Sequence, residues 1–153
     1  MKEIIYDVFW EGPFEWEKRH PYLKKYHVMY SIEGSHPVYG RNTLLYIGRT
    51  DVGMSNRLSY HDEWVDDEPD PVSVRVASIG EFTDWKTWEK LSHYPKANPE
   101  IVTKVEALLI FAHQPAYNTM GKSSLPQRKG IRIFNTGKCG LLLPELSYLY
   151  YRG

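Results

Sequence analysis

The stretch TLLYIGRTDVGMSNRLSYH, residues 43–61, decides the fold that we expect for this chain. Thr43 to Ile47 reads as a strand that stops at a glycine, and an Asp-Val-Gly turn follows. The next residues predict a helix, on which Arg57 and His61 lie four positions apart and therefore share a face. Tyr46 would meet this pair at a strand-to-helix corner. A tyrosine, an arginine and a histidine supply a proton acceptor, a bidentate phosphate ligand and a second proton-transfer group, which suits a phosphate ester.

Strand and helix patterns alternate along the rest of the chain, without an internal repeat or a dividing linker. Strands are predicted at residues 4–10, 26–32, 44–48, 72–79, 131–134 and 146–151, and helices at 13–22, 56–64, 83–91 and 99–112. This order is that of an α+β protein. A length of 153 residues fits a single domain, 1–153.

The composition is that of an ordinary soluble protein, with 42% hydrophobic and 25% charged residues. No run of residues reaches the ~18 apolar positions that a membrane span needs, and the N-terminus lacks the apolar region of a signal peptide. The single cysteine, Cys139, excludes an internal disulfide. We therefore expect a cytoplasmic protein with no membrane partner.

The charges are unevenly distributed although the formal net charge is zero. Residues 119–153 carry one anion and six cations, a net charge of +5: Lys122, Arg128, Lys129, Arg132, Lys138 and Arg152. This tail is either a surface for a polyanion or an ordinary charged surface. An acidic tract, expected to be a solvated loop, contains Asp62, Glu63, Asp66, Asp67, Glu68 and Asp70.

Glu106 is the second informative residue. In the predicted helix 99–112, Glu100 and Lys104 form an outward pair four positions apart. Glu106 lies about 200° around the helix axis from Lys104, at ~100° per residue, and so points away from that polar edge. A carboxylate there costs free energy unless a cation or donors meet it. It either forms a structural ion pair with an arginine or ligates a metal such as Mg²⁺, which prefers oxygen ligands and keeps part of its water shell.

Taken together, these residues resemble the GIY-YIG nuclease family. The second motif of the family is present verbatim as Tyr46-Ile47-Gly48. The first motif appears as Val28-Met29-Tyr30, which keeps the tyrosine but lacks the initial glycine. The family's arginine, histidine, glutamate and asparagine are matched by Arg57, His61, Glu106 and Asn118. The resemblance covers residues 26 to about 120.

The resemblance implies a small α/β sandwich with a central three-stranded antiparallel sheet flanked by helices. Its strands would be residues 26–32, 44–48 and 72–79. Residues 1–25 and 121–153 would be N- and C-terminal elaborations of this core, with a strand and helix packed on the sheet edge and a tail facing DNA.

The resemblance also implies a metal-dependent DNA endonuclease that hydrolyses phosphodiester bonds. Either Tyr30 or Tyr46 would act as the general base, and His61 would orient or deprotonate a tyrosine. Arg57 would bind the scissile phosphate, and Glu106 would hold one Mg²⁺ or Mn²⁺ ion.

Further roles follow from the same resemblance. Asn118 would brace the site near the glutamate helix, and Arg49 is placed either for a phosphate contact or as a surface arginine. The expected DNA contacts outside the site are Lys122, Arg128 and Lys129. The protein would act alone, as a homodimer or with a partner protein. The main alternative is a non-catalytic module of the same fold that binds nucleic acid or a protein.

Overall fold

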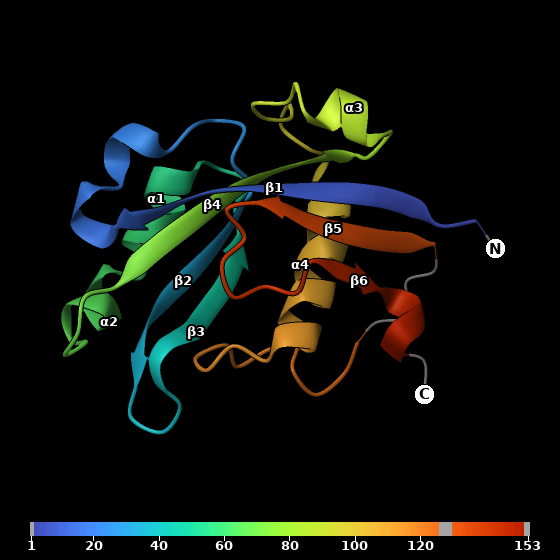
Figure 1. Cartoon of the computed structure of the whole chain (residues 1–153). Helices are drawn as coiled ribbons and strands as arrows, with labels where there is room; N and C mark the ends of the chain where they lie inside the picture. The colour runs from blue at the N-terminus through green and yellow to red at the C-terminus, as the bar shows by residue number, and fades with distance from the viewer. Residues whose placement is uncertain (1, 126–129, 152–153) are drawn as a thin grey trace.

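A computed structural model describes residues 2–125 and 130–151 of the chain. The fold is built on a curled, mixed six-stranded sheet with the strand order β3-β2-β4-β1-β5-β6 (Figure 1). Neighbouring strands are antiparallel, except that β1 and β5 are parallel. The strands are β1 (Ile4–Glu15), β2 (Met29–His36), β3 (Gly40–Arg49), β4 (Ser73–Glu81), β5 (Ile131–Gly137) and β6 (Glu145–Ser147).

The prediction of a central three-stranded sheet flanked by helices is therefore wrong. The three expected strands exist as β3, β2 and β4, and they pair antiparallel side by side, but the sheet continues through three more strands. β1 is an interior strand, with Val8 opposite Ile79 of β4 on one side and Asn135 of β5 on the other. Residues near both ends of the chain are thus integral parts of the sheet rather than elaborations at its edge.

The helices are few and mostly short: α1 (Met54–Ser59), α2 (Asp62–Asp66), α3 (Trp85–Trp88), α4 (Pro99–His113) and the 3₁₀ turns η1 (Trp16–Lys18), η2 (His20–Tyr22) and η3 (Tyr148–Tyr151). The helix predicted at 56–64 is divided at His61, which lies between α1 and α2. The helix predicted at 13–22 is also wrong, because β1 continues to Glu15. The β1–β4 register shifts between Glu11 and Phe14, and such a bulge accommodates a proline that cannot donate to the ladder.

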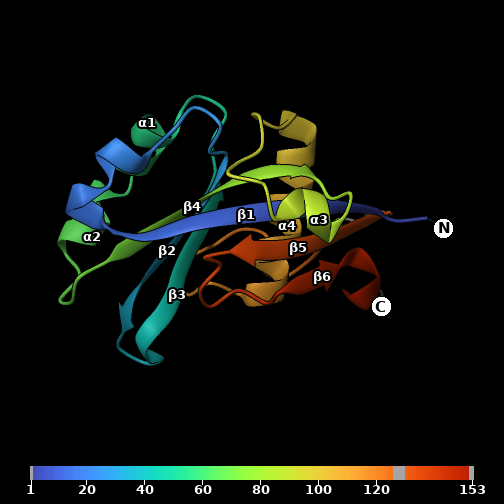
Figure 2. The same cartoon turned by 45° about the horizontal axis from the view of Figure 1, so that its top comes forward.

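The long helix α4 packs on one face of the sheet and reaches from β3 to β6 (Figures 1 and 2). Its buried face, which includes Val105 and Leu108, meets apolar residues of several strands such as Trp10 and Ile47. The second core lies around β2, β4, α1, α2 and η1, and it includes Trp16, Tyr30, Ile32, Leu58 and Val74. The two cores hold opposite faces of the β3-β2-β4 part of the sheet.

Helix α4 confirms the strongest helical prediction. The Asn98 side chain caps its first turn by accepting a hydrogen bond from the Glu100 backbone N–H, and the helix ends at Gln114 in a left-handed conformation. No helix in the described part of the chain is both long and apolar enough to cross a bilayer.

Candidate active site

Tyr30 and Gly48 face each other on β2 and β3. The Tyr30 ring occupies the space above Gly48, so that a Cβ at position 48 would lie only 2.3 Å from the Tyr30 hydroxyl oxygen. Tyr30 itself is fully buried. The glycine of the second motif therefore makes room for the tyrosine of the first, which gives a physical reason for both motifs on neighbouring strands.

His61 connects Tyr30 to a tryptophan. Its Nε2 atom lies 2.7 Å from the Tyr30 hydroxyl oxygen, and its Nδ1 atom accepts a hydrogen bond of 2.9 Å from the indole N–H of Trp64. An indole N–H can only donate, so a neutral His61 carries its proton on Nε2 and donates it to the Tyr30 oxygen. This arrangement fits the orienting role expected for His61, and it leaves no free ring nitrogen to take the Tyr30 proton.

The imidazole of His61 is held in its neutral form. Its side chain is buried, and burial together with the nearby positive charge of Arg57 lowers the pKa of His61 from 6.5 to about 4. Near pH 7 the ring is therefore uncharged. It serves as a fixed hydrogen-bond donor to Tyr30 rather than as a cation.

Tyr46 differs from Tyr30 in its exposure. It stacks near Tyr30 with 6.0 Å between ring centroids, and its ring lies 4.6 Å from that of His61. Tyr46 remains partly exposed, whereas Tyr30 has no accessible surface. Of the two candidate bases, Tyr46 is the one that solvent water reaches without a rearrangement.

Arg57 lies on α1 and donates from Nε to the backbone oxygen of Arg49 over 3.3 Å. Burial raises the pKa of Tyr30 well above its usual range, and the positive charge of Arg57 opposes that shift. Arg57 takes part in none of the ion pairs found among the described residues. Among the described residues its guanidinium group bonds the Arg49 carbonyl and lies 5.8 Å from the centroid of the Tyr60 ring.

Glu106 projects from α4 and is largely buried, with 23% of its side chain exposed. Its Oε1 atom accepts a hydrogen bond of 3.2 Å from Arg49 Nε, and Arg49 also lies 3.5 Å from a carboxylate oxygen of Asp51. Burial raises the pKa of Glu106, while Arg49 and Arg57 lower it. Of the two alternatives expected for Glu106, the ion pair with an arginine is therefore present. Its partner, Arg49, follows directly after the Tyr46-Ile47-Gly48 motif.

Two carboxylates, those of Glu106 and Asp51, pair with Arg49 and are the groups here that could take part in holding a metal ion. Among residues 2–125 and 130–151, no three His, Cys, Asp or Glu side chains gather to enclose a metal ion. Mg²⁺ in phosphate-processing sites needs only one or two carboxylates, with waters and the substrate phosphate. Both carboxylates are engaged by an arginine in this structure.

Arg57 joins the two parts of the site. Tyr30, Tyr46 and His61 belong to the core under α1 and α2, or lie against it, whereas Glu106 comes from α4 on the opposite face of the sheet. The charge of Arg57 nevertheless lowers the pKa of both Tyr30 and Glu106. The hydrogen bonds that link the two parts pass through Arg49 at the end of β3: Arg57 donates to the Arg49 backbone oxygen, and the Arg49 side chain donates to Glu106.

Asn118 acts on the backbone of the second motif. Its side-chain oxygen accepts from the Ile47 N–H and its amide donates to the Ile47 carbonyl, both over 2.9 Å. β3 is an edge strand, so these two groups would otherwise lack a partner in the sheet. Tyr117 N also donates to Leu45 O over 2.8 Å. Asn118 thereby fixes the strand that carries Tyr46 and Gly48.

The predicted DNA-binding tail is only partly described. Lys122 donates to the Pro115 carbonyl over 2.7 Å, and Arg128 and Lys129 lie outside the described residues. Arg132 forms ion pairs with Glu3 and Glu145, so this cation holds the two ends of the chain together.

Trp64 is a site residue that the sequence analysis missed. Its spacing from His61 contained a signal, because residues three positions apart meet on a helical turn.

Asp7 is a second buried ionisable residue that was not predicted to be of interest. A carboxylate in the middle of the apolar strand sequence IIYDVFW is unusual, because burial of a charged group is costly, and this was the available signal.

Comparison of the chain with family models, with curated proteins and with solved structures gave no match in any of the three. The resemblance to the GIY-YIG family therefore rests on the motif residues themselves. The six-stranded sheet observed here differs from the three-stranded sheet that this resemblance implies.

Proposed function

We propose that this protein is a divalent-metal-dependent endonuclease that hydrolyses DNA phosphodiester bonds. The observation that supports the proposal is the contact of Arg57 with the backbone of Arg49, whose side chain pairs with Glu106. Arg57 has no ion-pair partner in the described part of the chain, and its charge acts on both Tyr30 and Glu106. A scissile phosphate bound to Arg57 would have a hydroxyl-bearing group on one side and a carboxylate on the other.

Each side chain has a role in the proposed reaction. Tyr46, the partly exposed tyrosine, would act as its phenolate: it takes the proton of the attacking water and becomes the neutral phenol, while Tyr30 holds His61 in place beneath it. Arg57 binds the phosphate and stabilises the charge that develops in the transition state. Glu106 would hold one Mg²⁺ or Mn²⁺ ion, which supplies positive charge at the leaving oxygen when it is bound.

Nicking of supercoiled plasmid tests the proposal directly. Wild-type protein should nick with Mg²⁺ or Mn²⁺ and stop when a chelator is added, and Glu106→Gln and Arg57→Ala should lose the activity. Glu100→Gln is the matched control, because Glu100 lies on the same helix but is exposed and pairs with Lys104. Equal, metal-independent cleavage by wild type and Glu106→Gln would show that the proposed site is wrong.

The two tyrosines are separated by removing one hydroxyl at a time. Tyr46→Phe should abolish nicking because it removes the proton acceptor. Tyr30→Phe should slow nicking less, since it removes only the anchor of His61. The opposite ranking would transfer the role of base to Tyr30.

The second candidate is a module that binds nucleic acid without cleaving it. The Arg49–Glu106 ion pair favours this reading, because a carboxylate already neutralised by arginine is a weaker metal ligand. DNA binding without turnover in both Mg²⁺ and Mn²⁺ would support the module and reject the nuclease.

A further inference from the structure

A continuous series of aromatic rings leads from the proposed site to the tip of the β2–β3 hairpin. We call this series the aromatic track; its members in order are Tyr46, His61, Trp64, Tyr117, His36 and Tyr39. The successive ring centroids lie 4.6, 5.7, 5.3, 5.6 and 4.6 Å apart. His61, Trp64 and Tyr117 thus connect Tyr46 to the two rings at the hairpin tip, His36 and Tyr39, by direct ring contacts.

The track is most exposed at its hairpin end, although Tyr46 at the other end is also partly exposed. His61 is buried, Trp64 and Tyr117 are partly exposed, and Tyr39 is 69% exposed beside Val38, which is 80% exposed. Hairpin tips are usually formed by polar residues and glycine. A large aromatic and an aliphatic side chain at this tip contribute little to the core, which is consistent with a binding surface.

Positive charge borders the hairpin end of the track. Arg41 is exposed and has no ion pair in the described part of the chain. The Lys122 ammonium group bonds the Pro115 carbonyl, and the next residue, Ala116, donates to Leu44 of β3. Both cations therefore lie near the start of β3, where they can meet phosphates.

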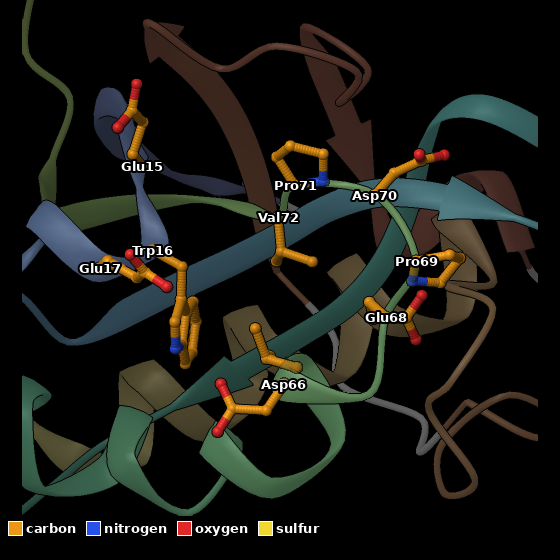
Figure 3. Close-up of a pocket in the computed structure, with 10 residues that line it drawn as sticks. Glu15, Trp16, Glu17, Asp66, Glu68, Pro69, Asp70, Pro71 and Val72 are labelled. Carbon is orange, nitrogen blue, oxygen red and sulfur yellow. The ribbon is translucent and has the colours of Figure 1, made fainter.

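Negative charge borders the track on its other side. The loop after α2 begins at Asp67, three residues beyond Trp64. Burial and the carboxylate of Glu68 in this loop raise the pKa of Tyr117. This loop helps to line a hollow of about 510 Å³, whose lining also includes Trp16 and the acidic residues Glu15, Glu17, Asp66, Glu68 and Asp70. Figure 3 shows these residues as sticks. A second phosphate backbone would be repelled here, because like charges oppose each other across a binding surface.

We propose that the site takes DNA with unpaired bases, and that a single strand follows the aromatic track with its bases stacked on the rings that are exposed, Tyr39 above all. Aromatic side chains bind unpaired bases in this way without regard to sequence, while cations follow the backbone. The proposal deepens the endonuclease function and rests on it. It names single-stranded or splayed DNA as the substrate class, in preference to intact duplex.

Binding without cleavage is the first test. Fluorescence anisotropy in the presence of a chelator compares a labelled oligothymidylate with a duplex of equal length. Wild type should bind the single strand more tightly, Tyr39→Ala should weaken that binding about tenfold, as expected for the loss of one stacked base, and Tyr39→Phe should retain it. Tyr150→Ala removes an exposed tyrosine at another part of the surface and should bind as wild type does.

Tighter binding to duplex than to single strand, or equal binding by Tyr39→Ala and wild type, would overturn the proposal. Neither result depends on the packing of the proposed active site, because Tyr39 is an exposed residue at the hairpin tip. Tyr39→Phe keeps the ring and removes only the hydroxyl, so it separates loss of stacking from loss of that hydroxyl.

Cleavage of a forked DNA and of the fully paired duplex with Mg²⁺ is the second test. Wild type should cut the fork faster, and the ratio of fork to duplex cleavage should fall in Tyr39→Ala. Equal cleavage of both DNAs by wild type would reject the substrate class while leaving the endonuclease intact. Strand binding that depends on Tyr39 without cleavage of either DNA would instead reject the endonuclease and leave the binding surface.

Discussion

Two tyrosine rings in this molecule lie across strand glycines. Tyr30 covers Gly48 on β3, and Tyr94 covers Gly80 on β4, where a Cβ would come within 2.0 Å of the ring. Each hydroxyl then meets a buried ionisable side chain. Tyr30 bonds His61, and Tyr94 donates to Asp7 over 2.7 Å.

Each pair is completed by an indole. Trp64 donates to His61, and Trp88 donates to Thr136, which in turn donates to Asp7. We refer to these groups as the Tyr30 cluster (Tyr30, His61, Trp64) and the Tyr94 cluster (Tyr94, Asp7, Thr136, Trp88). Their construction is closely parallel although they are unrelated in sequence.

The clusters differ in the charge beside them. Arg57, whose guanidinium has no ion-pair partner in the described part of the chain, lies near the Tyr30 cluster, where burial and this positive charge lower the pKa of His61. Asp7 also takes part in none of the ion pairs of that part, but its hydrogen-bond donors are two neutral hydroxyls, those of Tyr94 and Thr136. A tyrosine ring packed over a strand glycine occurs in both clusters, so this packing does not by itself indicate a functional site. The available cation is what turns one of the two into a candidate site.

The largest expected effect concerns this cation. Arg57→Ala should lower the nicking rate about 10²–10³-fold, the usual result of removing a group that stabilises transition-state charge, with little change in stability. Asp7→Asn, the matched change in the other cluster, should leave the nicking rate near that of wild type. Initial nicking rates and urea midpoints measure both. A nicking rate that depends on Asp7 and not on Arg57 would remove the distinction between the clusters.

Alanine at either glycine tests the shared packing. Neither Gly48 nor Gly80 has a positive φ, so the cost is steric, and each substitution should lower the free energy of unfolding by up to about 3 kcal/mol. Combining Gly80→Ala with Tyr94→Ala should remove most of the loss assigned to the added methyl group. Urea denaturation measures these values, and additive losses in the double variant would contradict the steric cause.

Acidification should affect the two clusters in opposite directions. The pKa of His61 falls from 6.5 to about 4 in the fold, so from pH 7 to pH 5 the unfolded chain gains a proton that the folded protein does not bind. The fold should lose about 2 kcal/mol of stability from this group over that interval. His61→Gln should flatten this part of the curve.

Burial raises the pKa of Asp7, so the folded protein binds a proton at a pH where the unfolded chain is still ionised. Asp7 therefore adds stability below its unfolded pKa of 3.8, and loses that contribution as the pH rises through the folded value. Asp7→Asn should make the acid loss steeper. Urea titrations at several pH values give both slopes, and equal slopes in Asp7→Asn and wild type would argue against the buried neutral acid.

The smallest expected effect separates the two indoles. Trp64→Phe keeps a ring but removes the N–H that holds His61, at a cost of about 1 kcal/mol. The pKa of His61 should rise and the acidic limb of the nicking profile should shift to higher pH. Trp88→Phe should lose similar stability without moving that limb. The pH dependence of nicking distinguishes a positioning role for Trp64 from a purely structural one.

Local signals in the sequence were sufficient where the structure is local. Asn98-Pro99 and Gln114-Pro115 mark the ends of α4, and its prediction at 99–112 is confirmed. The strand predicted at 44–48 lies within β3, and the one predicted at 72–79 coincides with β4 from Ser73 onward. Each of these elements is specified by caps, prolines or alternation within a few residues.

Pairing between distant segments could not be predicted in this way. Ile4 pairs with Ile131, and no periodic pattern in either segment identifies its partner. The number of strands in the sheet was missed for that reason. The candidate residues from Tyr30 to Asn118 were identified because the resemblance supplied a spacing, whereas Trp64 and Asp7 have no place in that spacing and emerged only from their contacts.

The interior position of β1 has a consequence for the order of events on the ribosome. β1 is synthesised before every other strand, yet its two neighbours are β4 and β5, and β5 begins only at Ile131. A nascent chain that has reached α4 can cover one edge of β1 and leaves the other edge unpaired, a state that invites pairing with another chain. The first strand to leave the exit tunnel is thus the one that waits longest for its second neighbour.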